Sequence, residues 1–417
     1  MKHIGVENEF ELASPYHTDE LNKQIIKLYI GNMSLILELK KIKRNFLRRR
    51  KFKSLTNALG SDILKSKDFR MNNIKECFKN RRIATPDTNI IDRVMASYNK
   101  AKSNQKSFSS AYQVGNEWLP IYERHMGDVI KALGSSDAAA TKTIYENFMR
   151  EDCSVGLHGL PIDMKEAYFS GNISNLNSDI HLHDSIYRYS HWLNLTENKY
   201  SLKDLQMPDY GNPYGYFVNN EFIRVGAEYL HYYASRIQEL IQEEKGRKVV
   251  VELGGGYGGL GYFLTRMESD LCYIDFDLPE NMALTAYYLL SSFPGKKILL
   301  YGEDEFNEQS SSNYDIIIMP NFELPKLASN IADLVFNSYS LAEMSTDTIS
   351  TYIPTLKEAC KKHFFHVNHT QISYSLKADD FGIEDNEFSL ITKKPALWNM
   401  GRDVNMDEFE FLYTRTR

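Results

Sequence analysis

The chain of 417 residues is 42% hydrophobic and 25% charged, which is typical of globular proteins and allows two or more domains with a substantial core. The net charge of −6 gives no reason to expect nucleic-acid binding, and no apolar run reaches the ~18 residues of a transmembrane helix. Four cysteines stand far apart without a C-x-x-C pair, so we expect neither a zinc site nor disulfides. The first residues lack the pattern of a secretory signal, and a cytoplasmic protein is expected.

The sequence pattern of residues 1–110 predicts a helical N-terminal region with a basic amphipathic segment. Apolar side chains recur there at helical spacing, at Leu35, Leu39, Ile42 and Phe46. Between positions 40 and 53 the chain has nine Lys or Arg residues, against the single acid Glu38 just before them. Two interpretations stay open. Residues 40–53 contact anionic lipid at the inner face of the membrane or an acidic partner in glycan assembly, or they are an ordinary solvated helix face.

Residues 111–246 predict a mainly helical region, which we expect to bind and cover the substrate. Helical patterns precede and open it, at 89–105 and 118–134, and a long amphipathic helix is expected over 221–246. The segment 150–220 is rich in Gly, Asn, Asp, Tyr and His, which predicts loops and short elements, with turns over 208–220.

A histidine motif, "HLHDSIYRYSH", lies inside this polar segment at 181–191. On a strand, His181 and His183 would point to one face, so a metal site is conceivable. A third ligand at a recognisable spacing is missing, and we therefore predict no metal. A polar loop that faces the substrate is one interpretation, and a plain surface loop is the other.

From residue 247 onward, apolar and β-rich runs alternate with helical patterns. Strands are expected at 248–255, 271–279, 296–304, 314–323, 332–340 and 363–370. Helices are expected at 260–267, 280–293 and 346–362. The alternation predicts an α/β fold for 247–417, with a mostly parallel sheet and helices on both faces.

The glycine-rich turn after the first of these strands, "ELGGGYGGLG", allows two interpretations. Gly254, Gly256 and Gly259 fit the G-x-G-x-x-G turn of dinucleotide-binding enzymes. Glu252, Gly254, Gly256 and Gly258 fit E-x-G-x-G-x-G, the loop that methyltransferases wrap around S-adenosylmethionine. Both cofactors use a glycine turn followed by a helix N-terminus, so the glycines alone do not decide.

Acidic side chains near the turn favour the second interpretation. A carboxylate before the turn would repel a pyrophosphate but attract the sulfonium and ammonium of S-adenosylmethionine, and Glu252 stands there. Asp277, at the end of the next strand, is expected to accept hydrogen bonds from ribose hydroxyls, with Asp275 on the same strand face. Dehydrogenases use an acid in that place as well, so Glu252 is the residue that discriminates.

Three ordered segments, "VVVELGGGYGGLG", "CYIDFDLPENMAL" and "DLVFNSYSLAEMS", resemble the class I S-adenosylmethionine-dependent methyltransferases. With "GNPYG" and "YLHYYASRI" upstream, residues 110–370 more closely resemble a bacterial family of sugar O-methyltransferases. The resemblance implies a Rossmann-like methyltransferase domain and transfer of a methyl group to a sugar hydroxyl, in cell-surface polysaccharide or activated-sugar biosynthesis. Transfer to a nitrogen or a phenolic hydroxyl is the main alternative. An NAD-dependent enzyme and a non-catalytic scaffold are further ones.

The resemblance also implies where the cofactor lies. The expected cofactor-binding residues are Glu252, Gly254, Gly255, Gly256, Gly258, Asp275, Asp277, Gly302, Glu303, Asp304 and Asn337. Within this set, the methionine moiety is expected at Glu252 and the glycines of the turn, and the ribose at Asp277. The adenine is expected at residues 302–304, after the third strand.

Methyl transfer to a hydroxyl needs a general base, because a neutral alcohol is a poor nucleophile. Where the phenolic O-methyltransferases have a His-Asp pair, the loop 337–347 has Ala342 and Glu343. Glu343 is therefore the first candidate, although Ser340-x-x-Glu343 also fits a helix capping box. His366 and His369, at the end of another strand, are the other candidates.

Aromatic side chains are candidates for the cleft wall, because sugar rings pack their C–H faces on aromatic rings. The expected substrate-binding residues are Tyr214, Tyr232, Tyr233, Arg236, His181 and His183. The expected partner is a small molecule or a glycan, and not a nucleic acid. The sequence predicts neither an oligomeric state nor which sugar is methylated.

Overall fold

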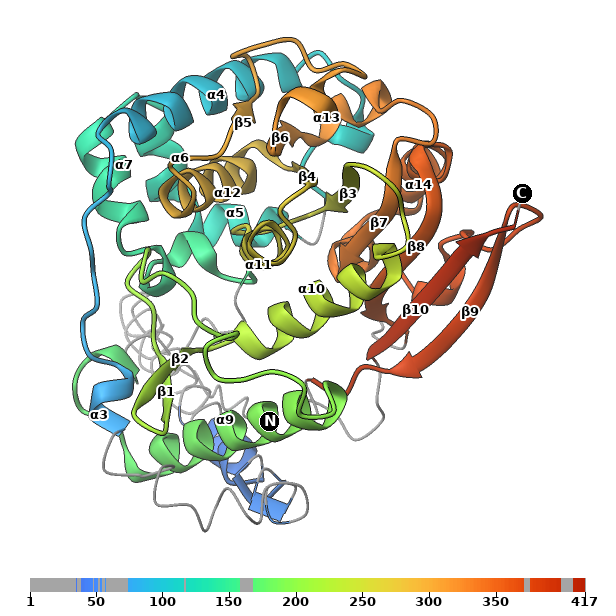
Figure 1. The fold of residues 1–417 in the computed structure, drawn as a ribbon. Helices are drawn as coiled ribbons and strands as arrows, with labels where there is room; N and C mark the ends of the chain where they lie inside the picture. The colour runs from blue at the N-terminus through green and yellow to red at the C-terminus, as the bar shows by residue number, and fades with distance from the viewer. Residues whose placement is uncertain are drawn as a thin grey trace, which may run out of the picture.

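The computed structural model describes residues 35, 39–47, 49–51, 53–54, 57, 74–115, 118–157, 168–370, 376–398 and 408–416. Its centre is a sheet that, within these ranges, has eight strands in the order β5-β6-β4-β3-β7-β8-β10-β9 (Figure 1). Their bounds are β3 (Lys248–Leu253), β4 (Leu271–Asp277), β5 (Ile298–Leu300), β6 (Ile316–Pro320), β7 (Ala332–Ser338), β8 (Cys360–His369), β9 (Phe388–Pro395) and β10 (Glu408–Arg415). The strands from β5 to β8 are parallel, and β10 is antiparallel to both β8 and β9. The predicted mostly parallel α/β fold is confirmed.

Helices cover both faces of this sheet. They are α10 (Ala227–Ile241), α11 (Gly259–Met267), α12 (Pro279–Ser292) and α14 (Thr346–Ala359), with the short α13 (Ser310–Asn313). The crossovers β3–α11–β4 and β4–α12–β5 run one way along the sheet, and β7–α14–β8 runs the other way. Helices α11 and α12 therefore lie on one face, next to α10, and α14 lies on the other (Figure 1). The order reverses between β3 and β7, which favours a ligand crevice at the carboxyl ends of these strands.

The centre of the sheet is buried on both sides, as parallel strands usually are. All seven residues of β4 are buried. Helix α11 lies close against β4, because Gly261 has no side chain: a Cβ atom there would lie 2.4 Å from the ring of Tyr273. The strands therefore give the loops at their carboxyl ends a rigid base.

The part of the chain that precedes the sheet is mainly helical, as expected. Its elements are α3 (Ile74–Cys77), α4 (Asn89–Gln105), η2 (Ser110–Tyr112), α5 (Leu119–His125), α6 (Gly127–Gly134), α7 (Ala138–Tyr145), η3 (Phe148–Arg150), η4 (Asp152–Ser154), α9 (Asn175–Leu195), β1 (Gly215–Val218) and β2 (Glu221–Arg224). Helix α4 packs on α12, where Lys102 Nζ lies 2.8 Å from a carboxylate oxygen of Glu280. The early helices are thus joined directly to the helical layer of the sheet.

Three expectations for residues 118–246 are wrong. Residues 175–195, expected as loops, form the 21-residue helix α9. Residues 221–224, expected as helix, form β2, which pairs with β1 across a two-residue turn. Asn219 and Asn220 have φ of 51° and 64° in that turn, the geometry that favours asparagine in tight hairpins. The helix expected over 118–134 is divided into α5 and α6, which meet at Met126.

The remaining elements are loops and short 3-10 helices, together with β9 and β10, which were not predicted from the sequence. The 3-10 helices are η6 (Asn321–Lys326), η7 (Ser340–Glu343) and η8 (Ala378–Asp380). The four cysteines are buried and unbridged. In the described ranges, no helix is both long and apolar enough to cross a bilayer. No three His, Cys, Asp or Glu side chains there are grouped so that they could hold a metal ion.

Candidate active site

A cavity of ≈ 290 Å³ lies at the carboxyl ends of β3, β4 and β7, where the strand order reverses. Its volume suits a metabolite-sized ligand. We call one part of its wall the turn side, which is formed by Glu252, Leu253, Gly254, Gly255, Gly256, Tyr257, Asp277, Leu278, Asn281 and Asn321. We call the other part the aromatic side, which is formed by Trp118, Arg188, Tyr229, Tyr233, Tyr339, Glu343, His369, Trp398 and Glu408.

Four backbone N–H groups of the glycine turn are already used inside the protein. Gly255 N donates to Asp275 Oδ1 (3.0 Å), and Gly256 N donates to Asp277 Oδ2 (3.1 Å). Gly254 N and Gly258 N donate to backbone carbonyls, at 2.8 and 2.9 Å. A pyrophosphate would need such N–H groups free and directed at it. These four N–H groups are therefore not available to a ligand, whereas the carboxyl groups of Glu252 and Asp277 line the cavity.

Three carboxyl groups are buried together around the turn. Burial raises the pKa of Glu252 to about 8, although the hydroxyl of Tyr273 donates a hydrogen bond to it. Burial raises the pKa of Asp277 to about 6, against hydrogen bonds from Leu278 N (2.7 Å) and other donors. Burial and the two neighbouring acids also raise the pKa of Asp275 well above its usual range. A bound cation would favour the ionised forms of these acids.

Two buried amide oxygens on the turn side have no hydrogen-bond partner among the described residues. Asn281 Nδ2 donates to Asp277 Oδ1 (3.1 Å) and Asn321 Nδ2 donates to the hydroxyl of Tyr352 (2.9 Å), while both Oδ1 atoms are unpaired. Buried acceptors of this kind are nearly always satisfied in a working protein. They favour a ligand with N–H or O–H donors next to Asp277.

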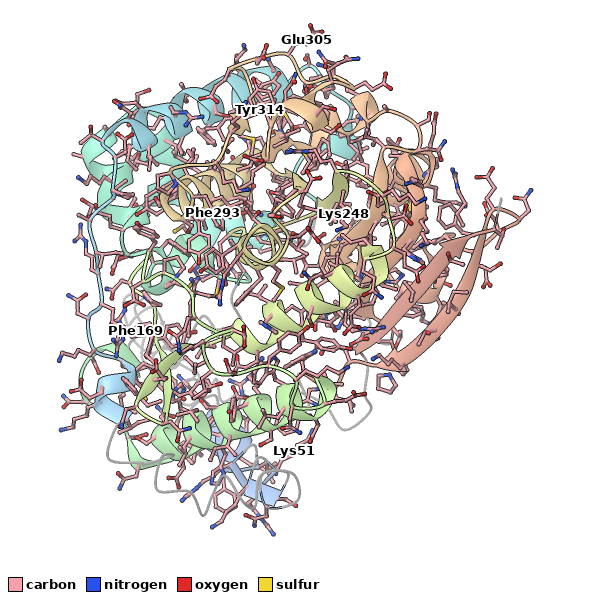
Figure 2. The ribbon with its side chains drawn as sticks, viewed as in Figure 1. Lys51, Phe169, Lys248, Phe293, Glu305 and Tyr314 are labelled. Carbon is pink, nitrogen blue, oxygen red and sulfur yellow. The ribbon has the colours of Figure 1, made fainter. Side chains whose placement is uncertain are left out.

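The predicted adenine site at Gly302, Glu303 and Asp304 lies away from the cavity. The strand that pairs with β4 is β6 and not β5, so the loop after β5 is at the outer edge of the sheet. Glu303 there pairs with Arg93 (2.7 Å), and Asp304 accepts a hydrogen bond from the hydroxyl of Tyr314 (2.9 Å). Figure 2 shows Tyr314 and Glu305 at this edge of the molecule. The loop that reaches the cavity follows β6 and contributes Asn321 instead.

Three other predicted cofactor residues lie behind the cavity wall. Asp275 is buried beneath the turn, and Gly258 immediately precedes α11. Asn337 is fully buried, where its Nδ2 donates to Leu253 O (2.8 Å) and its Oδ1 accepts from Asn368 Nδ2 (2.8 Å). These residues hold the turn and the neighbouring strands in place.

Of the predicted base candidates, Glu343 and His369 line the cavity and His366 does not. His366 is three positions before His369 on β8, and successive residues of a strand point to opposite faces, so the two imidazoles diverge. His366 is fully buried and stacked on Phe411, with ring centroids 4.7 Å apart. Burial lowers its pKa to about 3. The structure thus removes His366 from the candidates.

The capping interpretation of Glu343 is wrong. Ser340 Oγ donates to Leu253 O (3.1 Å), and the cap of α14 is Ser345, whose Oγ accepts from Thr348 N (3.1 Å). The Glu343 carboxylate accepts a hydrogen bond from Trp118 Nε1 at 2.6 Å. This hydrogen bond holds the indole ring of Trp118 in place on the aromatic side of the cavity.

Of the predicted substrate residues on β1 and α10, Tyr233 lines the cavity. Tyr214 is buried in the core beside β1, away from the wall. The hydroxyl of Tyr232 donates to Glu410 at 3.3 Å, and Arg236 forms a salt bridge within α10. These three residues do not contribute to the described wall of the cavity.

His181 and His183 lie on α9 and not on a strand. Two positions along a helix differ by about 200°, so the rings point in different directions. His181 Nε2 lies 2.8 Å from Gly215 O, and burial lowers the pKa of both histidines. Neither residue lines the cavity, so the expectation of a substrate-facing His-x-His pair is wrong.

Six residues of the aromatic side were not predicted from the sequence: Trp118, Arg188, Tyr229, Tyr339, Trp398 and Glu408. Tyr229 is four positions before Tyr233, so helical spacing within "YLHYYASRI" could have identified it. Arg188 lies on the helix that was expected to be a loop. Trp398 and Glu408 follow the last predicted strand, and no motif points to them.

Comparison with known proteins gives structural matches but no family. No protein-family model and no curated protein matches the chain. Its structure is similar to magnesium protoporphyrin IX methyltransferase from Synechocystis PCC 6803 with bound SAM (13% identity, TM-score 0.30, 45% of this chain and 80% of that chain). It is also similar to the N-methyltransferase NodS from Bradyrhizobium japonicum WM9 with S-adenosyl-l-homocysteine (10%, 0.31, 44% and 86%). A further match is the small RNA methyltransferase HEN1 (12%, 0.33, 46% and 25%). The function proposed below rests on the residues of the site and not on these similarities.

The raised pKa of Glu252 predicts how stability depends on pH in the ligand-free protein. A carboxyl group whose pKa rises from 4.5 to about 8 on folding makes the fold less stable as pH increases between these values. Glu252→Gln removes this ionisation and keeps an acceptor for Tyr273. We expect its melting temperature to exceed that of the wild type by several degrees at pH 8 and by much less at pH 5. Thermal melts followed by circular dichroism measure the difference, with the exposed Glu308→Gln as control. An equal offset at both pH values would contradict the raised pKa.

Proposed function

We propose that this chain is an S-adenosylmethionine-dependent methyltransferase. The observation that carries the proposal is the glycine turn, whose N–H groups are occupied by Asp275, Asp277 and backbone carbonyls while buried carboxyl groups surround it. A cationic ligand suits this arrangement, because its charge would stabilise the ionised acids. An NAD pyrophosphate would face like charge without free amides.

The residues of the turn side fit the parts of this cofactor. Glu252 is placed to accept its ammonium, next to the backbone of Gly254 and Gly256. Asp277 is placed to accept hydrogen bonds from the ribose hydroxyls. The unpaired oxygens of Asn281 and Asn321 are acceptors for the amino group of the adenine. When bound, S-adenosylmethionine supplies a methyl group that is activated for attack by its sulfonium.

We further propose that the acceptor is a sugar hydroxyl. The aromatic side combines rings with charged and hydrogen-bonding groups: Trp118, Tyr229, Tyr233, Tyr339 and Trp398 stand among Arg188, Glu343, His369 and Glu408. Flat rings pack on the C–H faces of a sugar, and polar groups orient its hydroxyls. The indole N–H of Trp398 is buried without a partner among the described residues and is a further donor. The resemblance of residues 110–370 to sugar O-methyltransferases supports the same acceptor.

The cofactor proposal predicts the effect of removing Asp277. We expect Asp277→Ala to weaken the binding of S-adenosylhomocysteine tenfold or more, since about 1.5–3 kcal/mol of charge-assisted hydrogen bonding is lost. Asp304→Ala is the matched control, because this acid follows β5, at the edge of the same sheet, and lies outside the cavity, so it should leave the affinity unchanged. Isothermal titration calorimetry measures both. Binding of NAD in place of S-adenosylhomocysteine would reject the proposal.

The acceptor proposal predicts which compounds receive the methyl group. A panel of nucleotide-activated sugars, free sugars, amines and phenols is incubated with the protein and with methyl-labelled S-adenosylmethionine. We expect label in the sugars, on oxygen, and little in the amines or phenols. Label mainly in an amine or a phenol would replace the sugar hydroxyl by the alternative acceptor.

We also propose that the basic segment, residues 40–53, contacts an anionic membrane surface. Residues 39–47 are helical, and the side chains of Leu39, Ile42 and Phe46 are 57%, 57% and 51% exposed among the Lys and Arg residues. Exposed apolar groups in a strongly basic helix are typical of helices that lie in a lipid interface. Arg49 is paired with Asp179 of α9, and Lys51 lies near α9, away from Glu305 (Figure 2).

The membrane proposal predicts charge-dependent binding to vesicles. We expect the protein to float with phosphatidylcholine vesicles that contain a quarter phosphatidylglycerol, and not with pure phosphatidylcholine, at ~0.1 M salt. The triple variant Lys40→Glu, Lys43→Glu, Arg50→Glu should lose this binding. The control variant Lys79→Glu, Lys131→Glu, Lys199→Glu, with the same change in charge elsewhere on the surface, should keep it. Equal flotation of the two variants would refute a role of this segment.

A further inference from the structure

At the aromatic side of the cavity, the ends of β8 and β10 bring a histidine and a glutamate together. His369 and Glu408 are directly opposite each other in the antiparallel register of these strands. Side chains of such a pair point to the same face of the sheet, with Cβ atoms about 4.5–5.5 Å apart. Both residues line the cavity, and only 9% and 5% of their surface is exposed.

Tyr339 holds this pair from a third strand. It directly follows β7, and its backbone N–H donates to Val367 O at 2.8 Å. Its hydroxyl donates to Glu408 Oε2 at 3.2 Å, and its ring centroid lies 5.1 Å from that of His369. Tyr339 has a φ of 64°, a left-handed conformation that is strained for a residue other than glycine. Such strain persists where the surroundings impose it, and it is frequent at active sites.

The other charged and titratable groups on this side are engaged by different partners. The groups that share the aromatic side with His369 are Glu408 on β10, Tyr339 and Glu343 at η7, Tyr229 and Tyr233 on α10, and Arg188 on α9. The hydroxyl of Tyr233 donates to Glu410 at 3.0 Å. Arg188 Nε is paired with Asp184 at 3.3 Å. The carboxylate of Glu343 accepts the indole N–H of Trp118, and the hydroxyl of Tyr229 is hydrogen-bonded to Ser338. Glu408 is the carboxylate that lies directly opposite the imidazole.

We propose that His369 is the general base of the methyl transfer and that Glu408 and Tyr339 position it; this rests on the proposed function. The acceptor oxygen forms the new O–CH₃ bond while the S–CH₃ bond breaks and leaves its electron pair on sulfur. The hydroxyl proton passes to the imidazole of His369, which becomes an imidazolium. The carboxylate of Glu408 stabilises that positive charge, and the Tyr339 hydroxyl keeps the carboxylate in place. No further reactant is needed.

The pH dependence of turnover tests the role of each residue. We expect His369→Asn to lower kcat about 100-fold or more, since a positioned base contributes that much. Glu408→Gln should lower kcat about tenfold and move the acidic limb of the kcat profile by about one unit to lower pH, because the imidazolium loses its counter-charge. Glu410→Gln is the matched control: this acid lies on the same strand and face but outside the cavity, and its profile should match the wild type.

Two further measurements separate this inference from the cofactor proposal. All three variants should bind S-adenosylhomocysteine with wild-type affinity, so a failure of binding in the wild type rejects the cofactor and not the base. Histidine NMR, with His369 assigned from the His369→Asn spectrum, should show a lower pKa for His369 in Glu408→Gln than in the wild type. Turnover of His369→Asn within threefold of the wild type would overturn the inference. The inference would also be overturned if Glu343→Gln abolished turnover and His369→Asn did not.

Discussion

The carboxylates of Asp275 and Asp277 hold the glycine turn by its own N–H groups, and the character of the whole site depends on this contact. The strand β4 is buried along its full length. The two aspartates are on one face of it, so both side chains point from the sheet toward the turn. A turn bound in this way cannot act as an anion cradle. It presents buried carboxyl groups whose ionised forms a bound cation would stabilise.

The same strand ends also fix the position of the N-terminal helices. Glu280, at the start of α12 and three residues after Asp277, is buried and receives the hydroxyl of Tyr122 (2.7 Å) and the ammonium of Lys102 (2.8 Å). Trp118 is held by Glu343 at the opposite wall. Ala111, Gln113 and Gly115, which lie between Lys102 and Trp118 in the chain, line the cavity, so these contacts help to position its wall.

The sequence was sufficient to predict the parallel strands of the sheet, but not their order, the strands β9 and β10, or the loops that complete the site. The strand-helix alternation after residue 247 and the acids beside the turn follow from local patterns, since burial of a parallel strand requires a continuous apolar run. Strand order does not follow from such patterns: β5 precedes β6 in the chain but lies outside it, which moved the expected adenine contact to Asp304 instead of Asn321. Helix α9 was missed because its buried face has Ser178, Ser185 and similar small polar residues in place of aliphatic ones. Glu408 has no local pattern at all, because only its pairing with β8 brings it to the cavity.

The aromatic and turn sides are parts of one rigid frame. Leu253, the last residue of β3 before the turn, has a carbonyl that accepts from Asn337 on β7 and from Ser340 on η7. Asn337 in turn accepts from Asn368, the neighbour of His369 on β8. A chain of buried side-chain hydrogen bonds thus runs from the start of the glycine turn to the strand that presents the histidine. Methyl transfer requires the acceptor oxygen and the methyl carbon to be held within a narrow range of distance and angle. Strands joined by buried amides meet this requirement with little reorganisation, whereas side chains on separate flexible loops would have to be ordered in each catalytic cycle.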